Sequence, residues 1–186
     1  LDENAIEICR DYIIKGNLDL FQFSIRGVTE DYNETPQTTI RRKSTEVLDC
    51  QRYLKKGELM VCAGGSCIRQ SIIQENKIRF NEKVRLAEDQ MFILSCISKS
   101  RRIQFLDKSL YNYLYVNSPY SYRGKTTEIL NTISVFNTYV KEYPEVEDYI
   151  NLQIIQFVVR LIKNNDIKYH EIKKAVNYKK ICFHKN

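Results

Sequence analysis

The chain has 186 residues, of which 43% are hydrophobic and 28% charged, and its formal net charge is +6. That length allows one domain with a sizeable core, and the scarcity of glycine and proline excludes a disordered or repeat-rich chain. The most apolar stretch, residues 154–162, contains Gln156 and Arg160 and is too short to cross a bilayer. A solvated basic surface is one interpretation of the charge, and an anionic substrate or membrane surface is the other.

The hydrophobic pattern predicts a mixed α/β portion followed by a helical tail. Asp2 is placed to cap the first helix, and Gly16 with Asn17 is placed to end it. Helical spacing predicts helices at residues 3–15, 45–55, 70–76, 88–98, 126–142, 146–163 and 167–178. Aliphatic and aromatic runs predict strands at residues 18–25, 38–42, 66–69, 102–106 and 109–115, with a loop at 27–37 and a turn at Asp107-Lys108.

The cysteines form no metal-binding or redox motif in the sequence. They stand at positions 9, 50, 62, 67, 96 and 182, without a CxxC pair or a nearby histidine. Four of them lie in apolar stretches, which predicts small buried side chains. No signal peptide is present, so we expect reduced thiols and a cytoplasmic location.

Several kinds of active site and partner are excluded by the residues that are available. The only histidines, His170 and His184, lie in the basic tail, which argues against a Ser-His-Asp or Cys-His hydrolase. Gly64-Gly65 lacks the surroundings of a phosphate-binding loop, and a tight turn and the lining of a substrate cleft both remain open for it. The absence of zinc-ligand spacing and of an aromatic ribonucleoprotein motif argues against nucleic acid.

The most specific pattern lies between Gly64 and Ser121. Gly65-Ser66-Cys67-Ile68-Arg69 is followed by Asn76-Lys77-Ile78-Arg79-Phe80, then by Ala87-Glu88-Asp89-Gln90-Met91-Phe92, and then by Leu110-Tyr111-Asn112-Tyr113. This order resembles the acceptor-side, C-terminal half of bacterial family-two glycosyltransferases, which build polysaccharides and lipid-linked sugars. In that family a GKLYR-like strand, a helix ending in ENNIRF, a GEDxxF motif and an LYxY strand follow one another. The resemblance covers about residues 1–122.

The sequence departs from the family pattern at four positions. Gly64 stands where a tryptophan is usual and Ser66 where a lysine is usual. Ala87 replaces the glycine that usually precedes Glu-Asp, and Leu114 replaces a frequent arginine. These differences affect the expected acceptor and phosphate contacts more than the reaction class.

The resemblance implies a partial GT-A-like mixed sheet flanked by helices. Residues 1–123 would form the acceptor-side half of a glycosyltransferase domain, and residues 124–186 a C-terminal helical extension. The chain begins with Leu1 on a helix signal, so we expect an excised fragment that lacks the nucleotide-binding half and is inactive alone. The divalent metal of the family, manganese or magnesium, would have its ligands outside this chain.

The resemblance also implies roles for individual residues. Asp89 would be the general base of an inverting transfer from a nucleotide-sugar donor to a saccharide or lipid-linked acceptor. Further acceptor or cleft candidates are Glu88, Gly64, Gly65, Arg69 and Tyr113. Acidic residues also favour a helix N-terminus, so a capping role remains open for Glu88.

Two alternatives stay open at this stage. A glycosyltransferase-derived scaffold without catalytic activity would carry the same motifs. The lysine-rich tail, which includes Lys168, Lys173 and Lys174, is consistent with a solvated helix face or with adhesion to an anionic inner membrane face, where a lipid-linked acceptor would lie.

Overall fold

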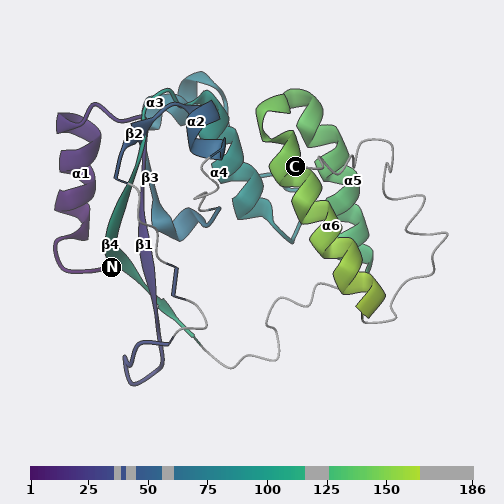
Figure 1. The fold of residues 1–186 in the computed structure, drawn as a ribbon, viewed down its shortest axis with the longest axis horizontal. Helices are drawn as coiled ribbons and strands as arrows, with labels where there is room; N and C mark the ends of the chain where they lie inside the picture. The colour runs from purple at the N-terminus through teal and green to yellow at the C-terminus, as the bar shows by residue number, and fades with distance from the viewer. Residues whose placement is uncertain (36–38, 41–44, 56–60, 116–125, 164–186) are drawn as a thin grey trace. The chain divides into compact units, whose positions relative to one another are not determined.

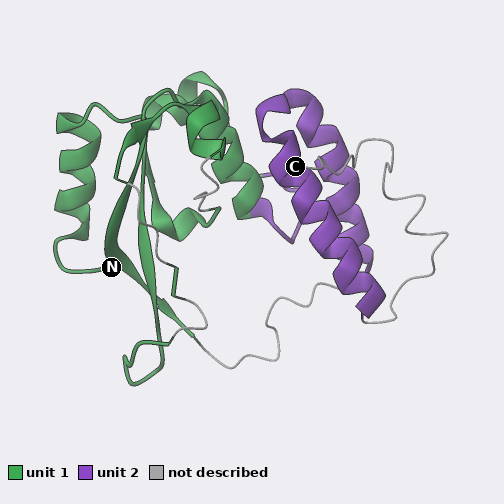
Figure 2. Cartoon of the chain, viewed as in Figure 1, with its two compact units in different colours: residues 1–80, 89–121 green, residues 81–88, 122–186 purple. Residues whose placement is uncertain are grey.

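The computed structural model describes residues 1–35, 39–40, 45–55, 61–115 and 126–163. Its chain forms two compact units, which Figure 2 distinguishes by colour. Unit 1 comprises Leu1–Phe80 and Asp89–Ser121, and unit 2 comprises Asn81–Glu88 and Tyr122–Asn186.

Unit 1 is built on a four-stranded mixed sheet with the strand order β2-β4-β1-β3 (Figure 1). The two long strands, β1 (Leu20–Val28) and β4 (Ile103–Leu114), pair in parallel. The short strands β2 (Val47–Leu48) and β3 (Ser66–Ile68) pair antiparallel with β4 and β1 respectively. The mixed α/β class that the sequence predicts is confirmed.

Helices cover the two faces of this sheet, with α1 (Ala5–Lys15) on one side and α4 (Glu88–Lys99) on the other (Figure 1). Beneath α1, Phe21 and Phe23 pack with the helix in one apolar cluster. The ring of Tyr12 stacks on that of Phe21 with 4.4 Å between their centroids. This face of the sheet is closed by apolar packing.

The start of α1 differs from the expected capping arrangement. Asn4 occupies the cap position without a side-chain hydrogen bond. The carboxylate of Asp2 instead accepts a hydrogen bond from Arg26 at 3.3 Å, and its backbone N–H donates to Leu110. The predicted Asp2 cap is therefore wrong, because the side chain is used to join the chain start to β1.

Two further predictions fail in the segments around β1 and β2. The expected helix at residues 45–55 is a strand followed by a short helix, α2 (Cys50–Lys55), because Val47 and Leu48 pair with β4. The expected loop at residues 27–37 begins late, since β1 continues to Val28. Of the strand expected at residues 38–42, Ile40 forms an isolated bridge with Ile25, and residues 41–42 lie outside the described residues.

The predicted turn at Asp107-Lys108 is also wrong, because β4 is one continuous strand with an irregular stretch there. The β1–β4 register shifts on both sides of Ser24. The Ser24 hydroxyl donates to Asp107 at 3.3 Å. Beyond the shift, Ile25 packs with Phe105, which lies opposite Gln22 in the register. A β-bulge changes the face of the sheet to which the following side chains point. Here it places the apolar Ile25 on the face opposite α1.

The remaining helices agree with the sequence predictions. They are α3 (Gln70–Glu75), α5 (Thr126–Glu142) and α6 (Glu147–Lys163), with a short 3₁₀ turn at Pro144–Val146 before α6. In unit 2 the rings of Phe136 and Phe157 stack with centroids 6.1 Å apart. The helix expected at residues 167–178 lies outside the described residues, and no helix within them is long and apolar enough to span a membrane.

Replacing Phe21 with alanine should lower the free energy of unfolding by about 3–5 kcal/mol, because the fully buried ring leaves a cavity beneath α1. Urea denaturation measures this loss. The control Ile6→Ala removes a side chain that is 69% exposed and should change stability by less than about 0.5 kcal/mol. Equal losses for both variants would contradict the packing of α1 on β1.

Candidate functional site

Asp89 lies in the first turn of α4, directly after a strained backbone position. Ala87 has a φ of 63°, in the left-handed region that side chains with a Cβ disfavour. Ala87 therefore adopts a glycine-type conformation, at the position where the glycosyltransferase pattern that this sequence resembles has glycine. The strained residue directs the chain into the helix that carries Asp89, whose carboxylate accepts a hydrogen bond from the Gln90 N–H at 2.7 Å.

An aromatic pair fixes the start of this helix within unit 1. The rings of Phe80 and Phe92 lie parallel, with centroids 4.2 Å apart and an interplanar angle of 1°. The two motifs that end in these phenylalanines thus meet in space. Such stacking adds to the apolar burial and holds the first turns of α4 against the segment that follows α3.

A glycine-containing turn precedes β3. Ala63–Gly65 forms a single 3₁₀ turn that is closed by a hydrogen bond from the Gly65 N–H to the Cys62 carbonyl at 3.2 Å. The Ser66 hydroxyl donates to the same carbonyl at 3.2 Å. The backbone N–H groups of Gly64 and Gly65 also act on the Cys62 sulfur, where they lower the pKa of the thiol. The turn is therefore closely held around Cys62.

A buried polar network attaches this turn to the centre of the sheet. The Gln22 side chain is fully buried in β1, where its amide nitrogen donates to the Ser66 hydroxyl at 2.8 Å. Its amide oxygen accepts a hydrogen bond from the Tyr53 hydroxyl of α2. An unpaired buried amide would lower the stability of the fold. These two hydrogen bonds therefore hold β1, α2 and the start of β3 in fixed positions.

The charge of Asp89 acts on the cysteine that precedes the glycine turn. Burial raises the pKa of the Cys62 thiol, and the negative charge of Asp89 raises it further, against the opposing effect of the Gly64 and Gly65 N–H groups. The effect on the Cys62 thiol is what links three of the residues expected from the sequence, Asp89, Gly64 and Gly65.

Two tyrosines of β4 lie near this turn. Tyr111 and Tyr113 pack, together with Cys62, against the cluster of Ile25 and Phe105, and Tyr111 also packs against the cluster beneath α1. A Cβ atom at Gly64 would lie 3.3 Å from the Tyr111 ring, so a side chain there would require the ring to move. The missing side chain of Gly64 thus leaves room for the Tyr111 ring. The half-buried Tyr113 packs against the same apolar cluster as Cys62.

The remaining two candidates lie in different settings. The Arg69 guanidinium donates to the Leu18 carbonyl at 3.0 Å and to the Ile13 carbonyl at 2.9 Å, at the end of α1. These bonds satisfy carbonyls that a helix end leaves unpaired, so Arg69 joins α1 to β3. Glu88 is half-buried at the first position of α4.

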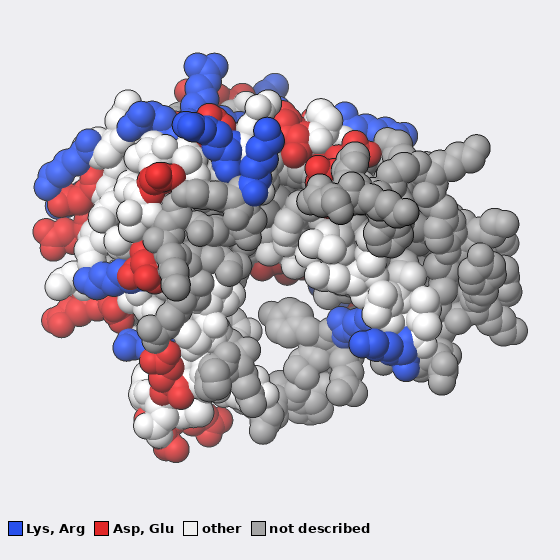
Figure 3. Space-filling model, viewed as in Figure 1, with Lys and Arg blue, Asp and Glu red and all other residues white. Residues whose placement is uncertain are grey.

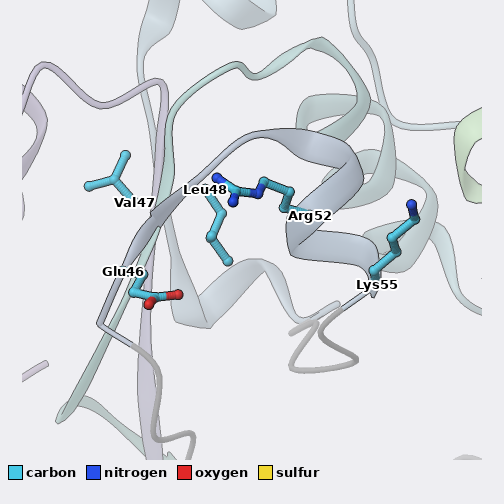
Figure 4. Close-up of a pocket in the computed structure, with 5 residues that line it drawn as sticks. All are labelled: Glu46, Val47, Leu48, Arg52 and Lys55. Carbon is cyan, nitrogen blue, oxygen red and sulfur yellow. The ribbon is translucent and has the colours of Figure 1, made fainter.

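A pocket of about 610 Å³ lies elsewhere in unit 1, beside β2 and α2. Its described lining consists of Glu46, Val47, Leu48, Arg52 and Lys55. In Figure 4, Arg52 extends toward β2 and Lys55 points away from it. None of the residues predicted from the sequence as site residues is among these five.

The charge of the described surface is mixed. Figure 3 shows basic and acidic side chains interspersed on the visible face of unit 1. Within the described ranges, no three His, Cys, Asp or Glu side chains are grouped so that they could hold a metal ion. The lysine-rich tail, which the sequence suggests as a membrane-binding segment, lies outside the described residues.

One neighbour of the turn, Cys62, was not predicted from the sequence as a site residue, because there it is one of several apolar-flanked cysteines. The alternation of Tyr111 and Tyr113 along the strand is a sequence signal for side chains that line a cleft. The approach of the Tyr111 ring to Gly64 depends on the packing of β4 against the turn.

The comparisons identify a glycosyltransferase-like fold. No protein-family model matches the chain, and no curated protein sequence matches it. S. aureus TarS 1–349 in complex with UDP-GlcNAc aligns with a TM-score of 0.62 and 15% identity over 93% of this chain and 52% of that one. The complex of TarS 1–349 with UDP gives 0.55 and 16% over 94% and 53%. TarS is a glycosyltransferase, and this chain spans about half the length of those structures.

Replacing Ala87 with glycine should raise the free energy of unfolding by about 0.5–1 kcal/mol, because glycine adopts positive φ without the steric cost of a Cβ. The same change at Ala5, buried at the start of α1, should lower it by about 1–2 kcal/mol. Urea denaturation of both variants measures the difference in sign. A loss at Ala87 as large as that at Ala5 would refute the strain.

Replacing Asp89 with asparagine should speed alkylation of Cys62 by iodoacetamide at pH 8 by roughly two- to five-fold. Removing the negative charge lowers the pKa of the thiol, which increases the thiolate fraction at fixed pH. Peptide mapping by mass spectrometry isolates the rate at Cys62. Glu88→Gln is the matched control and should leave that rate unchanged; an equal effect of both variants would show that Asp89 does not face the turn.

Proposed function

We propose that this chain is part of a glycosyltransferase that moves a sugar from a nucleotide-sugar donor to a hydroxyl of a saccharide or lipid-linked acceptor. The observation that carries the proposal is the position of Asp89, at the start of α4 and beside the glycine turn, in a fold similar to that of TarS. The TarS structures contain UDP-GlcNAc and UDP, which supports a uridine nucleotide sugar as the donor class.

Asp89 acts in this proposal as the general base. The acceptor oxygen forms a bond to the anomeric carbon while the bond from that carbon to the diphosphate oxygen breaks. The acceptor hydroxyl proton passes to the Asp89 carboxylate, and the nucleoside diphosphate leaves with the bonding electrons. A hydroxyl is a poor nucleophile until its proton is removed, so a positioned carboxylate contributes about 10²–10⁴-fold. A single displacement of this kind inverts the anomeric centre.

The surroundings of Asp89 fit the acceptor side of such a reaction. The half-buried Tyr111 and Tyr113 offer aromatic rings and hydroxyl groups to a sugar ring near the glycine turn. The Gln22 network keeps that turn in place during turnover. These residues bind and orient the acceptor hydroxyl toward the carboxylate.

The proposal assigns the donor diphosphate to residues outside this chain. A GT-A-type enzyme uses manganese or magnesium to neutralise the leaving diphosphate, and we place the ligands of that cation in the part of the enzyme that this chain does not include. When bound, the cation would stabilise the negative charge of the leaving group. The acceptor chemistry at Asp89 is independent of which cation is bound.

Replacing Asp89 with asparagine in the longest natural form of this protein should reduce sugar transfer by about 10²–10⁴-fold, because asparagine cannot accept the acceptor's proton. The assay measures release of nucleoside diphosphate from UDP- and GDP-sugars with p-nitrophenyl glycosides as acceptors. The melting temperature should change little, since asparagine keeps the size of aspartate and its preference for helix starts.

Glu88→Gln is the matched control, because it neutralises the neighbouring carboxylate in the same turn. We expect it to retain most of the activity. If Asp89→Asn turns over at the parent rate, Asp89 has a helix-capping role only and the proposed mechanism is wrong. If no sugar in the panel is transferred or bound by the parent, a non-catalytic scaffold is the better assignment.

A further inference from the structure

Two cysteines that are far apart in the sequence meet between α1 and the sheet. Cys9 lies on the buried face of α1, one turn after Ala5, and is 8% exposed. Cys67 lies in β3 directly opposite Phe21 of β1. Because opposed residues of paired strands share a face, Cys67 points toward α1 as Phe21 does. Both cysteines belong to the apolar cluster beneath that helix.

The Cys9 thiol favours the thiolate of Cys67 and lowers the pKa of Cys67 to about 7, against the opposing effect of its partial burial. The same interaction, burial and the charge of Cys67 together raise the pKa of Cys9. A lowered pKa increases the thiolate fraction of Cys67, and the thiolate is the reactive form of cysteine.

The other described cysteines lie in different environments. Burial raises the pKa of Cys96 to about 12, and it is fully buried in α4. Burial also raises the pKa of Cys62. Cys67 is half-buried, whereas Cys50 and Cys96 are buried. The Cys9–Cys67 pair thus combines a reactive thiolate with an adjacent second thiol.

We propose that Cys9 and Cys67 are a redox-modification site that forms a reversible disulfide on reaction with a small-molecule disulfide such as oxidised glutathione. The Cys67 thiolate attacks one sulfur of the reagent, its S–S bond breaks, and one glutathione leaves as a thiolate that takes up a proton. Cys9 then loses its proton and attacks the Cys67 sulfur of the mixed disulfide, which releases the second glutathione. The two cysteines lose two electrons, and the reagent gains them.

The bond would link two elements that are otherwise joined by packing and by Arg69. β3 is a three-residue edge strand that starts at the glycine turn, and α1 covers the face to which Cys67 belongs. A covalent link between them removes freedom from the unfolded chain between Cys9 and Cys67, which stabilises the folded state. This inference uses no part of the proposed transfer reaction and stands or fails independently of it.

The experiment incubates the chain with oxidised glutathione at pH 7.5, traps free thiols with N-ethylmaleimide, and maps peptides by mass spectrometry without reduction. We expect a cross-linked peptide containing Cys9 and Cys67, two hydrogen masses lighter than the sum of its parts. Reduction with dithiothreitol should reverse it. Oxidation should raise the melting temperature by about 5–10 °C.

Matched variants separate this site from general thiol oxidation. Cys9→Ala should leave Cys67 as a mixed disulfide with glutathione and abolish the rise in melting temperature. Cys62→Ser should retain the cross-link, because Cys62 is not part of the pair. The proposal is overturned if the parent gives only a mixed disulfide at Cys67, if Cys67 pairs with another cysteine, or if oxidation lowers the melting temperature.

Discussion

The burial of β1 on both faces is the constraint on which the rest of unit 1 depends. Its nine residues run between β4 and β3, and all but Arg26 are buried. One face presents Phe21 and Phe23 to α1, where apolar packing suffices. The other face carries Gln22 and Ser24, whose polar atoms must be paired once water is excluded.

The pairing of these polar groups determines where the site lies. Gln22 joins Tyr53 to Ser66 and so holds the glycine turn on the sheet. Ser24 bonds to Asp107, where the register of β4 shifts. Beyond that shift, Tyr111 and Tyr113 reach the surroundings of the turn. Gln22 and Ser24 of β1 thus determine the positions of both the glycine turn and the two tyrosines of β4.

Backbone strain occurs beside Asp89, as it does at three other described positions, Asn17, Tyr32 and Lys77. Ala87 adopts a glycine-type conformation immediately before α4. A strained residue is retained when its surroundings over-determine it. The strain at Ala87 therefore fixes the entry into α4, and it does not by itself mark a functional site.

The sequence was most informative where a segment's own pattern determines its structure. The helix predicted at residues 126–142 has those bounds, because its apolar stripe and polar face leave no competing arrangement. β2 could not be predicted from its own two residues, since it forms only through pairing with β4. Asp107-Lys108 has turn-forming residues, but the bond from Ser24 accommodates them within a bulged strand. Asp89 is predicted from its motif, whereas the effect of its charge on Cys62 depends on tertiary packing.

The central claim is that Asp89 acts on the acceptor hydroxyl and does not bind the donor. Calorimetric titration of UDP-GlcNAc into the longest natural form of the protein, with and without Asp89→Asn, tests it most directly. The account predicts dissociation constants that agree within about two-fold, a difference of roughly 0.4 kcal/mol. A weakening of donor binding by ten-fold or more, about 1.4 kcal/mol, would make Asp89 a donor ligand and contradict its role as the base.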